Sequence, residues 1–249
     1  MISAVILTKN EEKNIEVCLK SLDFCDEIIV IDDNSVDKTV ELAKKSKAKV
    51  FTRALNNDFS RQRNFGLEKA HEEWVLFIDA DERVSPSLCD EITQLTNNPI
   101  TQCNGFYIKR RDFMWENELK CGETGDIKLL RLARKEGGKW EGRVHEKWKV
   151  KGKLGELKNL LLHYPHQTIT EFLREINFYT DIRAQELYEK GTSVYWWSII
   201  LYPKVKFFRN FFVKKGFLDG LPGLILALMM SFHSFLVRGK LWLMQQKKN

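Results

Sequence analysis

The amino-terminal third of the chain alternates between short apolar runs and segments with apolar residues at helical spacing. The apolar runs predict four strands, at 4–8, 27–31, 49–51 and 74–78. Three helices are predicted between them, at 9–22, from residue 35 or 37 onwards, and at 58–71. Strands that alternate with helices form a parallel sheet covered on both faces. The pattern therefore predicts an α/β, Rossmann-like, mainly parallel sheet flanked by helices.

The pattern changes after residue 81. A helix is predicted at 85–95, and four strand-like segments follow, at 105–111, 126–134, 140–150 and 157–163. We expect this half of the sheet to be mixed or antiparallel. Residues 169–189 predict an amphipathic helix, since Phe172, Ile176 and Tyr179 recur at near-helical spacing. The expected organisation is an α/β domain at 1–165 followed by a C-terminal helical region at 166–249.

The carboxyl-terminal tail differs from the rest in charge and in aromatic content. The net charge is +6, but residues 190–249 carry ten Lys or Arg and one acid, whereas residues 1–189 carry thirty bases and thirty-three acids. The tail also holds twelve of the 29 aromatic residues. Basic residues interleaved with Trp, Tyr and Phe favour an anionic membrane surface as the partner, and no nucleic acid.

An uncharged run in the tail, 221–237, bears on how it would meet a membrane. Its seventeen residues fall short of the about 20 apolar residues that a span needs. We therefore expect an amphipathic pair of helices lying in the membrane interface. Packing of these helices on protein, or a dimer interface, is the alternative.

The cysteines and the amino terminus indicate a cytoplasmic protein. Five cysteines, an odd number with no CxxC pair, suggest a reducing compartment. Met1 is followed directly by a predicted strand, without a basic segment and a long apolar run, so we expect no cleaved signal peptide. Together with the tail, this predicts a cytoplasmic protein, peripheral on the inner face of the cell membrane.

Two of the predicted strands end in acidic residues. Asp79 and Asp81 follow the run 74–78 and stand at i and i+2, so in extended backbone their side chains project to the same side. Asp32 and Asp33 follow the second strand and would lie on the same edge of a parallel sheet, where ligands bind in open α/β folds. Acidic groups gathered there need a metal or hydrogen-bond donors. This favours a functional site over solvated strand ends.

Four ordered motifs carry a family resemblance. They are Leu7-Thr8-Lys9-Asn10-Glu11, Ile31-Asp32-Asp33-Asn34-Ser35-Val36-Asp37-Lys38-Thr39, Arg63-Asn64-Phe65-Gly66 and Phe77-Ile78-Asp79-Ala80-Asp81-Glu82. With them the sequence resembles the family 2 glycosyltransferases, whose fold is called GT-A. The later His145-Glu146 and residues 216–223 are most similar to bacterial enzymes of this family, the lipopolysaccharide inner-core β-glucosyltransferases. The resemblance implies a GT-A catalytic domain at 1–165.

The resemblance also implies how the donor, a nucleotide-diphosphate sugar, would be bound. Thr8, Glu11 and Asp33 would line the nucleoside pocket, and Asp79 would hold the ribose or the sugar. Asp81 would bind Mg²⁺ or Mn²⁺, ions that prefer oxygen ligands and neutralise charge on the leaving diphosphate.

Arg63 has two expected roles: it would contact phosphate or stabilise a neighbouring carboxylate. For Asp33 and Asp37, the alternative is a loop that caps a helix, because Asp favours N-caps. This alternative explains Asp37 well, but it explains the adjacent pair Asp32-Asp33 at a strand end poorly.

An inverting transfer needs a carboxylate that takes the proton of the acceptor hydroxyl. Members of the family commonly have an acidic pair for this task, but the expected position here reads Arg143-Val144-His145-Glu146. Glu146 is the candidate base, and His145 is the candidate metal ligand or orienting group. A surface His-Glu pair on a strand is the alternative.

The implied function is a metal-dependent, inverting glycosyltransferase. It would move a hexose, with glucose expected, from a UDP-sugar to a lipid-linked or lipopolysaccharide-core acceptor. The Gln-x-x-Arg-Trp run of processive synthases is absent from the sequence, which favours transfer of one sugar per acceptor.

Two functions from other classes fit the sequence less well. A nucleotidyltransferase would carry a Gly-rich, basic loop after the first strand, where Lys9-Asn10-Glu11-Glu12 stands. A non-catalytic sugar-binding or membrane-binding module would be expected to have lost a carboxylate, yet Asp79 and Asp81 are both present.

Overall fold

The structure is a computed structural model that describes residues 1–97, 102–143, 146–165 and 167–246. The chain forms two compact units. The first contains residues 1–110 and 127–163, and the second contains residues 111–126 and 164–249. Residues 111–126 thus belong to the helical unit, although they include the end of the strand Gly105–Met114, which begins in the first unit.

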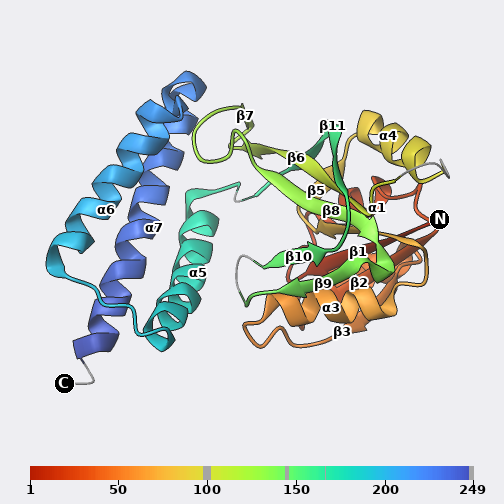
Figure 1. Ribbon diagram of the computed structural model, residues 1–249, viewed down its shortest axis with the longest axis horizontal. Helices are drawn as coiled ribbons and strands as arrows, with labels where there is room; N and C mark the ends of the chain where they lie inside the picture. Colours follow the sequence, from red (N-terminus) through yellow and green to blue (C-terminus); the bar gives the residue numbers. More distant parts are fainter. Residues whose placement is uncertain (98–101, 144–145, 166, 247–249) are drawn as a thin grey trace. The chain divides into compact units, whose positions relative to one another are not determined.

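The amino-terminal strands form the parallel part of a mixed sheet (Figure 1), in the order β3-β2-β1-β4. These strands are β1 (Ile2–Thr8), β2 (Glu27–Asp32), β3 (Lys49–Thr52) and β4 (Trp74–Asp79). The helices between them are α1 (Ile15–Lys20), α2 (Thr39–Lys45) and α3 (Phe59–Lys69). The predicted alternation of strands and helices is confirmed, although α1 is shorter than expected because residues 9–14 form a loop.

The remaining strands continue the same sheet in the order β8-β6-β11-β5 beyond β4, and β7 pairs with β6. The pairs β4–β8, β6–β8, β6–β7 and β11–β5 are antiparallel, as expected for this half. The elements are β5 (Glu82–Val84), α4 (Pro86–Thr96), β6 (Gly105–Met114), β7 (Asn117–Leu119), β8 (Lys128–Arg134), the 3-10 turn η1 (Lys135–Gly137) and β11 (Leu154–His163). Nine strands make up this sheet within the described residues.

The segment 140–150 was predicted as one strand, and this prediction is wrong. It contributes to a separate antiparallel hairpin of β9 (Gly138–Glu141) and β10 (Lys147–Val150), in which Trp140 lies opposite Trp148. The aromatic rings of these two residues stack, with centroids 5.4 Å apart. Gly142, at φ 100°, follows β9 in the left-handed region that favours glycine, so the chain turns where a continuous strand was expected.

The central strands are buried on both faces, as the continuous apolar run of β4 predicts. Leu76 and Ile78 pack into one core cluster, whereas Val75 and Phe77 pack into another on the opposite side of the strand. Gly66 of α3 is required by this packing, because a Cβ there would stand 2.4 Å from Cγ1 of Val5. The glycine lets α3 approach β1 closely, and this fixes the side chains of the neighbouring turn of α3.

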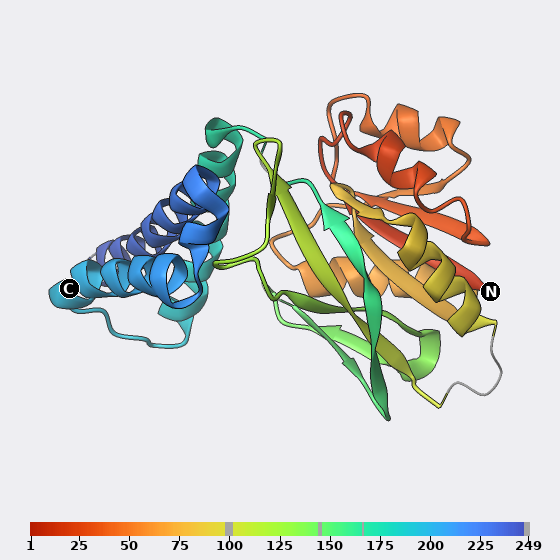
Figure 2. The same cartoon turned by 90° about the horizontal axis from the view of Figure 1, so that it is seen from above.

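The second unit contains three long helices. They are α5 (Ile169–Glu189), α6 (Trp196–Phe208) and α7 (Gly220–Gln246), and a π-helical turn η2 (Arg209–Val213) and a 3-10 turn η3 (Gly216–Asp219) join the last two. Figure 2 shows α6 and α7 side by side, and α7 packs on both α5 and α6. A capping box of Thr168 and Glu171 begins α5, at the residue expected from the sequence. The segment from Gly216 to Gln246 is long and apolar enough to cross a membrane, judged by length and composition alone.

Candidate active site at the carboxyl edge of the sheet

The acidic strand ends lie at one edge of the parallel sheet, as predicted. Thr8 of β1 lies opposite Asp32 of β2, and Leu7 of β1 lies opposite Asp79 of β4. Neighbouring strands are about 4.8 Å apart, so Asp32 and Asp79 end strands that are roughly 10 Å apart. The fold therefore brings the first two acidic motifs to the same edge.

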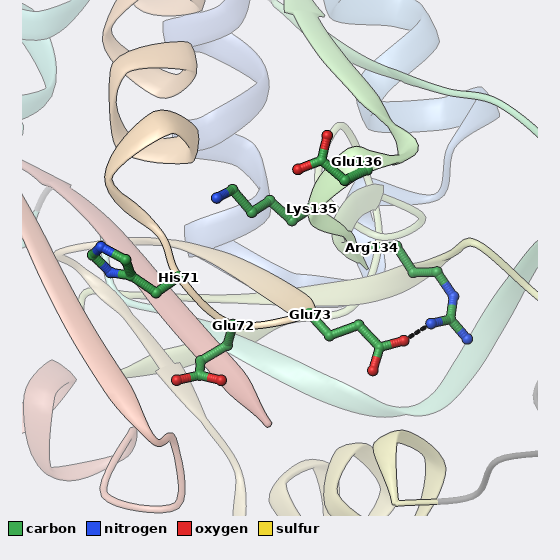
Figure 3. Close-up of a pocket in the computed structure, with 6 residues that line it drawn as sticks. All are labelled: His71, Glu72, Glu73, Arg134, Lys135 and Glu136. Atoms are coloured by element: carbon green, nitrogen blue, oxygen red, sulfur yellow. Dashed lines mark ion pairs between the residues drawn. The ribbon is translucent and has the colours of Figure 1, made fainter.

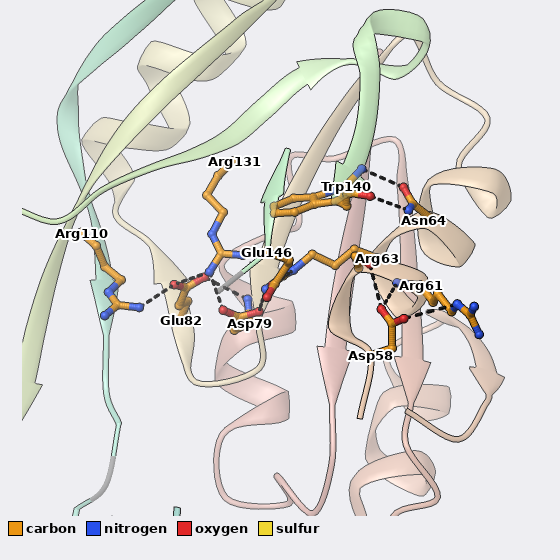
Figure 4. Close-up of polar contacts among 11 residues, drawn as sticks. Asp58, Arg61, Arg63, Asn64, Asp79, Glu82, Arg110, Arg131, Trp140 and Glu146 are labelled. Atoms are coloured by element: carbon orange, nitrogen blue, oxygen red, sulfur yellow. Dashed lines mark hydrogen bonds and ion pairs between the residues drawn. The ribbon is translucent and has the colours of Figure 1, made fainter. Parts of the chain in front are cut away.

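Asp79 is held between two arginines (Figure 4). Its Oδ1 accepts a hydrogen bond of 2.9 Å from Nη2 of Arg63, and its Oδ2 forms an ion pair with Nη2 of Arg131. Both arginine side chains are buried, and β8 supplies Arg131. Burial alone would raise the pKa of Asp79, but the two guanidinium charges lower the pKa well below its usual range. Asp79 is therefore ionised, with both carboxylate oxygens already engaged by cations.

Glu82 supports the turn that separates the two aspartates. Its Oε2 accepts the main-chain N–H of Asp79 at 2.9 Å, and its Oε1 accepts from Nη2 of Arg131 at 3.0 Å. The residue is completely buried, and burial, with the nearby Asp79 charge, raises the pKa of Glu82 despite Arg131. Arg131 thus bridges Asp79 and Glu82 and fixes the geometry of the Asp79-Ala80-Asp81 turn.

Asp81 points elsewhere, toward His163 at the end of β11. The distance between Oδ2 of Asp81 and Nε2 of His163 is 3.2 Å, and the Asp81 side chain is 24% exposed. Burial would raise the pKa of Asp81, but His163 lowers it, and the net shift is downward. His163 was not among the residues predicted from the sequence, although it is a polar residue at the carboxyl end of a predicted strand.

The donor atoms of this pair fit a divalent cation. Carboxylate and imidazole together suit Mn²⁺, whereas Mg²⁺ prefers oxygen ligands alone. Within the described part of the chain no group of three or more His, Cys, Asp or Glu is placed to hold a metal. Asp81 and His163 would thus supply part of a coordination sphere, and phosphate and water oxygens would complete it. His145, the predicted ligand, lies outside the described residues.

Arg63 also reaches the candidate base. Its Nε donates to Oε1 of Glu146 at 2.6 Å, and its guanidinium lies 4.7 Å from the ring centroid of Trp140. The neighbouring Asn64 forms two hydrogen bonds of 2.9 Å with the main chain of Trp140. The Arg63-Asn64 pair thereby joins β4 and the β9–β10 hairpin, and in this structure Arg63 contacts carboxylates, one of its two expected roles.

The loops after β1 and β2 form the side of the edge expected to receive the nucleoside. Oγ1 of Thr8 and Oδ1 of Asp32 are buried and lack hydrogen-bond partners within the described residues. Asp33 is engaged by Lys9 and by the main-chain N–H of Leu55, at 2.7 and 2.8 Å. Oε2 of Glu11 accepts from Asn14 at 2.7 Å. Thr8 and Asp32 thus each retain a buried polar atom without a partner in the described part of the chain, whereas Asp33 and Glu11 order the loops.

A cavity of about 300 Å³ lies away from this edge (Figure 3). It is lined by His71, Glu72 and Glu73, which precede β4, by Arg134, the last residue of β8, and by Lys135 and Glu136 of η1. These residues are at the amino end of β4, opposite to Asp79. The cavity therefore contains none of the candidate site residues.

The sequence matches the profile of Glycosyl transferase family 2 over residues 3–143. The chain belongs to this family. The match covers more than half of the chain and includes all four motifs at the edge of the sheet.

Individual relatives are similar to this family 2 chain over nearly its whole length. Over 97% of its length it is 27% identical to the lipopolysaccharide core biosynthesis glycosyltransferase LpsC of Rhizobium meliloti, of which 92% is covered. It is 28% identical over 96% of its length to an uncharacterised glycosyltransferase of Rickettsia typhi, of which 86% is covered.

Two solved structures were also similar. TarS 1–349 of S. aureus in complex with UDP-GlcNAc aligns with a TM-score of 0.49 at 16% identity, over 99% of this chain and 92% of that one. Glucosyl-3-phosphoglycerate synthase of Mycobacterium tuberculosis, in complex with Mn²⁺, UDP and glucosyl-3-phosphoglycerate, aligns with a TM-score of 0.36 at 25% identity, over 46% and 44%.

Family membership decides between the alternatives drawn from the sequence. The chain is a glycosyltransferase, so neither the nucleotidyltransferase nor the non-catalytic module is retained. The mixed sheet, parallel at its amino-terminal part and followed by a long apolar C-terminal helix, has the GT-A organisation that the resemblance implied. Sequence motifs and fold therefore agree on the enzyme class.

Proposed function

We propose that this family 2 glycosyltransferase is an inverting, non-processive enzyme that transfers a hexose to a lipid-linked or lipopolysaccharide-core acceptor. The donor would be a UDP-sugar, and UDP-glucose is the first candidate. The observation that carries the proposal is the divided acidic motif: Asp79 is neutralised by Arg63 and Arg131, while Asp81 faces His163 and remains partly exposed. The relative LpsC, named for lipopolysaccharide core biosynthesis, supports the acceptor class.

Asp81 and His163 are the residues that would hold the divalent cation, and the imidazole of His163 favours Mn²⁺ over Mg²⁺. When bound, the cation would neutralise the charge that grows on the leaving diphosphate. The remaining steps belong to the chain's own side chains. Oδ1 of Asp32 would accept a hydrogen bond from the nucleoside, and the hydroxyl of Thr8 would donate or accept one.

Glu146 would remove the proton from the acceptor hydroxyl as that oxygen attacks the anomeric carbon. Its Oε1 is held by Arg63, and its Oε2 has no hydrogen-bond partner within the described residues. The Arg63 contact fixes the carboxylate in one orientation relative to Asp79, which Arg63 also binds. A general base placed in this way would act on an acceptor at the same edge as the donor.

The test of the proposed function is a screen for transfer. Purified protein would be incubated with UDP-glucose, UDP-galactose, UDP-GlcNAc and GDP-mannose, with Mn²⁺, Mg²⁺ or EDTA, and release of the nucleotide diphosphate would be followed. We expect release from one UDP-sugar, stimulated by lipopolysaccharide-core acceptor and lost with EDTA. Equal release in EDTA would contradict the metal assignment, and release from the GDP-sugar alone would contradict the donor.

We also propose that the enzyme works on the cytoplasmic face of the membrane. The relative named for lipopolysaccharide core synthesis and the basic, aromatic tail support this location.

A further inference from the structure

The helical unit exposes far more apolar surface than the sheet unit. Among the described residues 25 large hydrophobic side chains are exposed; eighteen of them lie between Tyr195 and Leu243, whereas residues 1–163 contribute four. Soluble monomers rarely expose contiguous apolar patches of more than a few hundred Å². We therefore expect this apolar surface to be covered by a membrane or by another protein.

Helix α6 is apolar along most of its surface, apart from Ser198, Lys204 and Lys206. Trp196, Ile200 and Phe208 are 72%, 52% and 58% exposed, and within the helix only Ser198 is buried. A helix that is hydrophobic all round is normally buried in a core or in a membrane. Contact with α7 covers one stripe of α6 and leaves the rest uncovered.

The apolar surface continues through the turn that follows α6, and this turn is firmly held. The carboxylate of Asp219 accepts the main-chain N–H groups of Lys120 and Cys121. A Cβ on Gly223 would stand 2.0 Å from the carbonyl oxygen of Gly216, so only glycine allows this close contact. Phe212 and Leu218 are therefore exposed, at 49% and 62%, by a well-packed turn.

Unpaired cations border the same surface. Lys204, Arg209 and Lys215 are exposed, and none of them forms an ion pair within the described part of the chain. Lys206, by contrast, is paired with Glu123 at 2.7 Å. Asp219 is the only acid in residues 190–249, and it faces the main chain. This combination of apolar area and cations complements a surface of anionic headgroups.

The packing of α7 favours a surface position over a span. On one side α7 is covered by α5, through Phe172, Ile176 and Leu226, and Lys240 of α7 is paired with Asp181 of α5 at 2.7 Å. Helix α5 carries charged residues along its length. A helix of this kind is excluded from hydrocarbon, so α7 would have to leave α5 in order to cross a bilayer.

We propose that the outer face of α6 and the turn formed by η2 and η3 are a lipid-binding surface that lies in the headgroup region of one leaflet of an anionic bilayer. The partner is the bilayer surface itself. This deepens the proposed cytoplasmic-membrane location, and it does not depend on which sugar the enzyme transfers, because vesicle binding and transfer are measured separately.

Flotation of the full-length protein with vesicles tests the proposal. The vesicles would contain phosphatidylethanolamine and phosphatidylglycerol at 3:1, with phosphatidylcholine vesicles for comparison. Each cation near an anionic surface strengthens partitioning by roughly five-fold. We expect Lys204→Gln/Arg209→Gln/Lys215→Gln to lower partitioning by about a hundred-fold, and Trp196→Ser/Ile200→Ser/Phe208→Ser to abolish it.

The matched control variants make the same kinds of substitution outside the proposed lipid-binding surface. Lys20→Gln/Lys44→Gln/Lys151→Gln removes three exposed cations of the first unit, and Leu173→Ser/Phe178→Ser removes exposed apolar groups of α5. Both should float like the wild type. An equal loss of vesicle binding in the control variants would overturn the proposal. So would a wild-type protein that forms dimers in solution and does not bind vesicles. A wild type that resists alkaline carbonate extraction and is indifferent to the charge changes would indicate a spanning helix, which also overturns it.

Discussion

Asp81 and His163 face each other at the carboxyl edge of the sheet, with Oδ2 and Nε2 3.2 Å apart. They come from the turn after β4 and from the last residue of β11, 82 positions later in the chain. Asp81 is thus paired with a histidine, whereas Asp79 is neutralised by Arg63 and Arg131. The two aspartates of one short motif therefore have different electrostatic partners.

For Asp81→Asn we expect transfer to be abolished with little loss of stability. The carboxylate is partly exposed, so losing its pair with His163 should cost little stability, while the change deletes a candidate metal ligand. Nucleotide release, Mn²⁺ affinity by calorimetry and the melting temperature would be measured together. Asp90→Asn on α4 is the matched control, and full activity of the Asp81 variant would contradict the ligand assignment.

For Glu146→Gln we expect donor binding to survive and the turnover rate to fall by about 10²-fold or more, because a general base acts in the transition state. The amide oxygen can still accept the hydrogen bond from Nε of Arg63, so the site should keep its geometry. UDP binding by calorimetry and single-turnover rates separate the two effects. A normal rate in this variant, with a collapse in Glu141→Gln, would move the role to Glu141.

Arg131→Met should destabilise the first unit strongly. Arg131 is buried and bridges the buried Glu82 and Asp79, so its loss leaves two carboxylates without compensation, at a cost of about 3–5 kcal/mol. Urea denaturation followed by tryptophan fluorescence measures the change. Arg61→Met removes a surface ion pair with Asp58 and should cost less than about 1 kcal/mol. Equal costs for the two variants would show that the Arg131 bridge is not a stabilising feature, and Arg131→Lys provides a milder variant if the first does not fold.

The lowered pKa of Glu27, at the opposite edge of the sheet, predicts that the protein loses part of its stability in acid. Burial would raise its pKa, but hydrogen bonds from Lys49, Ser3 and His71 lower the pKa of Glu27 to about 2. A carboxylate with a lowered folded-state pKa stabilises the protein above its unfolded pKa of about 4.3, and this stabilisation disappears as the pH falls toward 2. Glu27→Gln should therefore lose roughly 2–3 kcal/mol at pH 7 and much less at pH 2.5.

Urea midpoints of wild type and Glu27→Gln between pH 2.5 and 7 would show this convergence. The exposed Glu41, paired with Lys45, supplies the control: Glu41→Gln should follow the wild-type profile. A deficit of Glu27→Gln that stayed constant with pH would indicate lost packing and would contradict the electrostatic origin.

The sequence predicted the strands and helices whose periodicity is strong. The apolar run 74–78 could be assigned to a doubly buried strand, and α5 begins and ends at the predicted residues because a capping box and a long apolar stripe define it. The β9–β10 hairpin was not foreseen, because its alternating Trp and Lys residues read equally well as one strand. The three residues of β5 are too few to produce a periodic signal.

The candidate site residues were likewise predictable only where a local sequence motif marks them. Asp79, Asp81 and Arg63 could be selected because they stand in compact motifs. His163 and Arg131 could not, since each lies alone in a strand and acquires its partner only when β8 and β11 are brought beside β4 by long-range pairing. Glu82 was visible in its motif, but its role in holding the turn depends on a hydrogen bond to the main chain.

The insertion of residues 111–126 into the helical unit has a consequence for how the protein can be dissected. The chain passes between the two units at three places, after residues 110, 126 and 163. A protease that cut only after residue 163 would sever one of these passages and leave residues 111–126 bound to Asp219 and Asn210. The fragments should remain together in native conditions and separate only in denaturant. A chain ended at residue 165 would expose the surface of 111–126 that the helices cover, so the catalytic sheet is not expected to be obtained as a well-behaved fragment by truncation at that point.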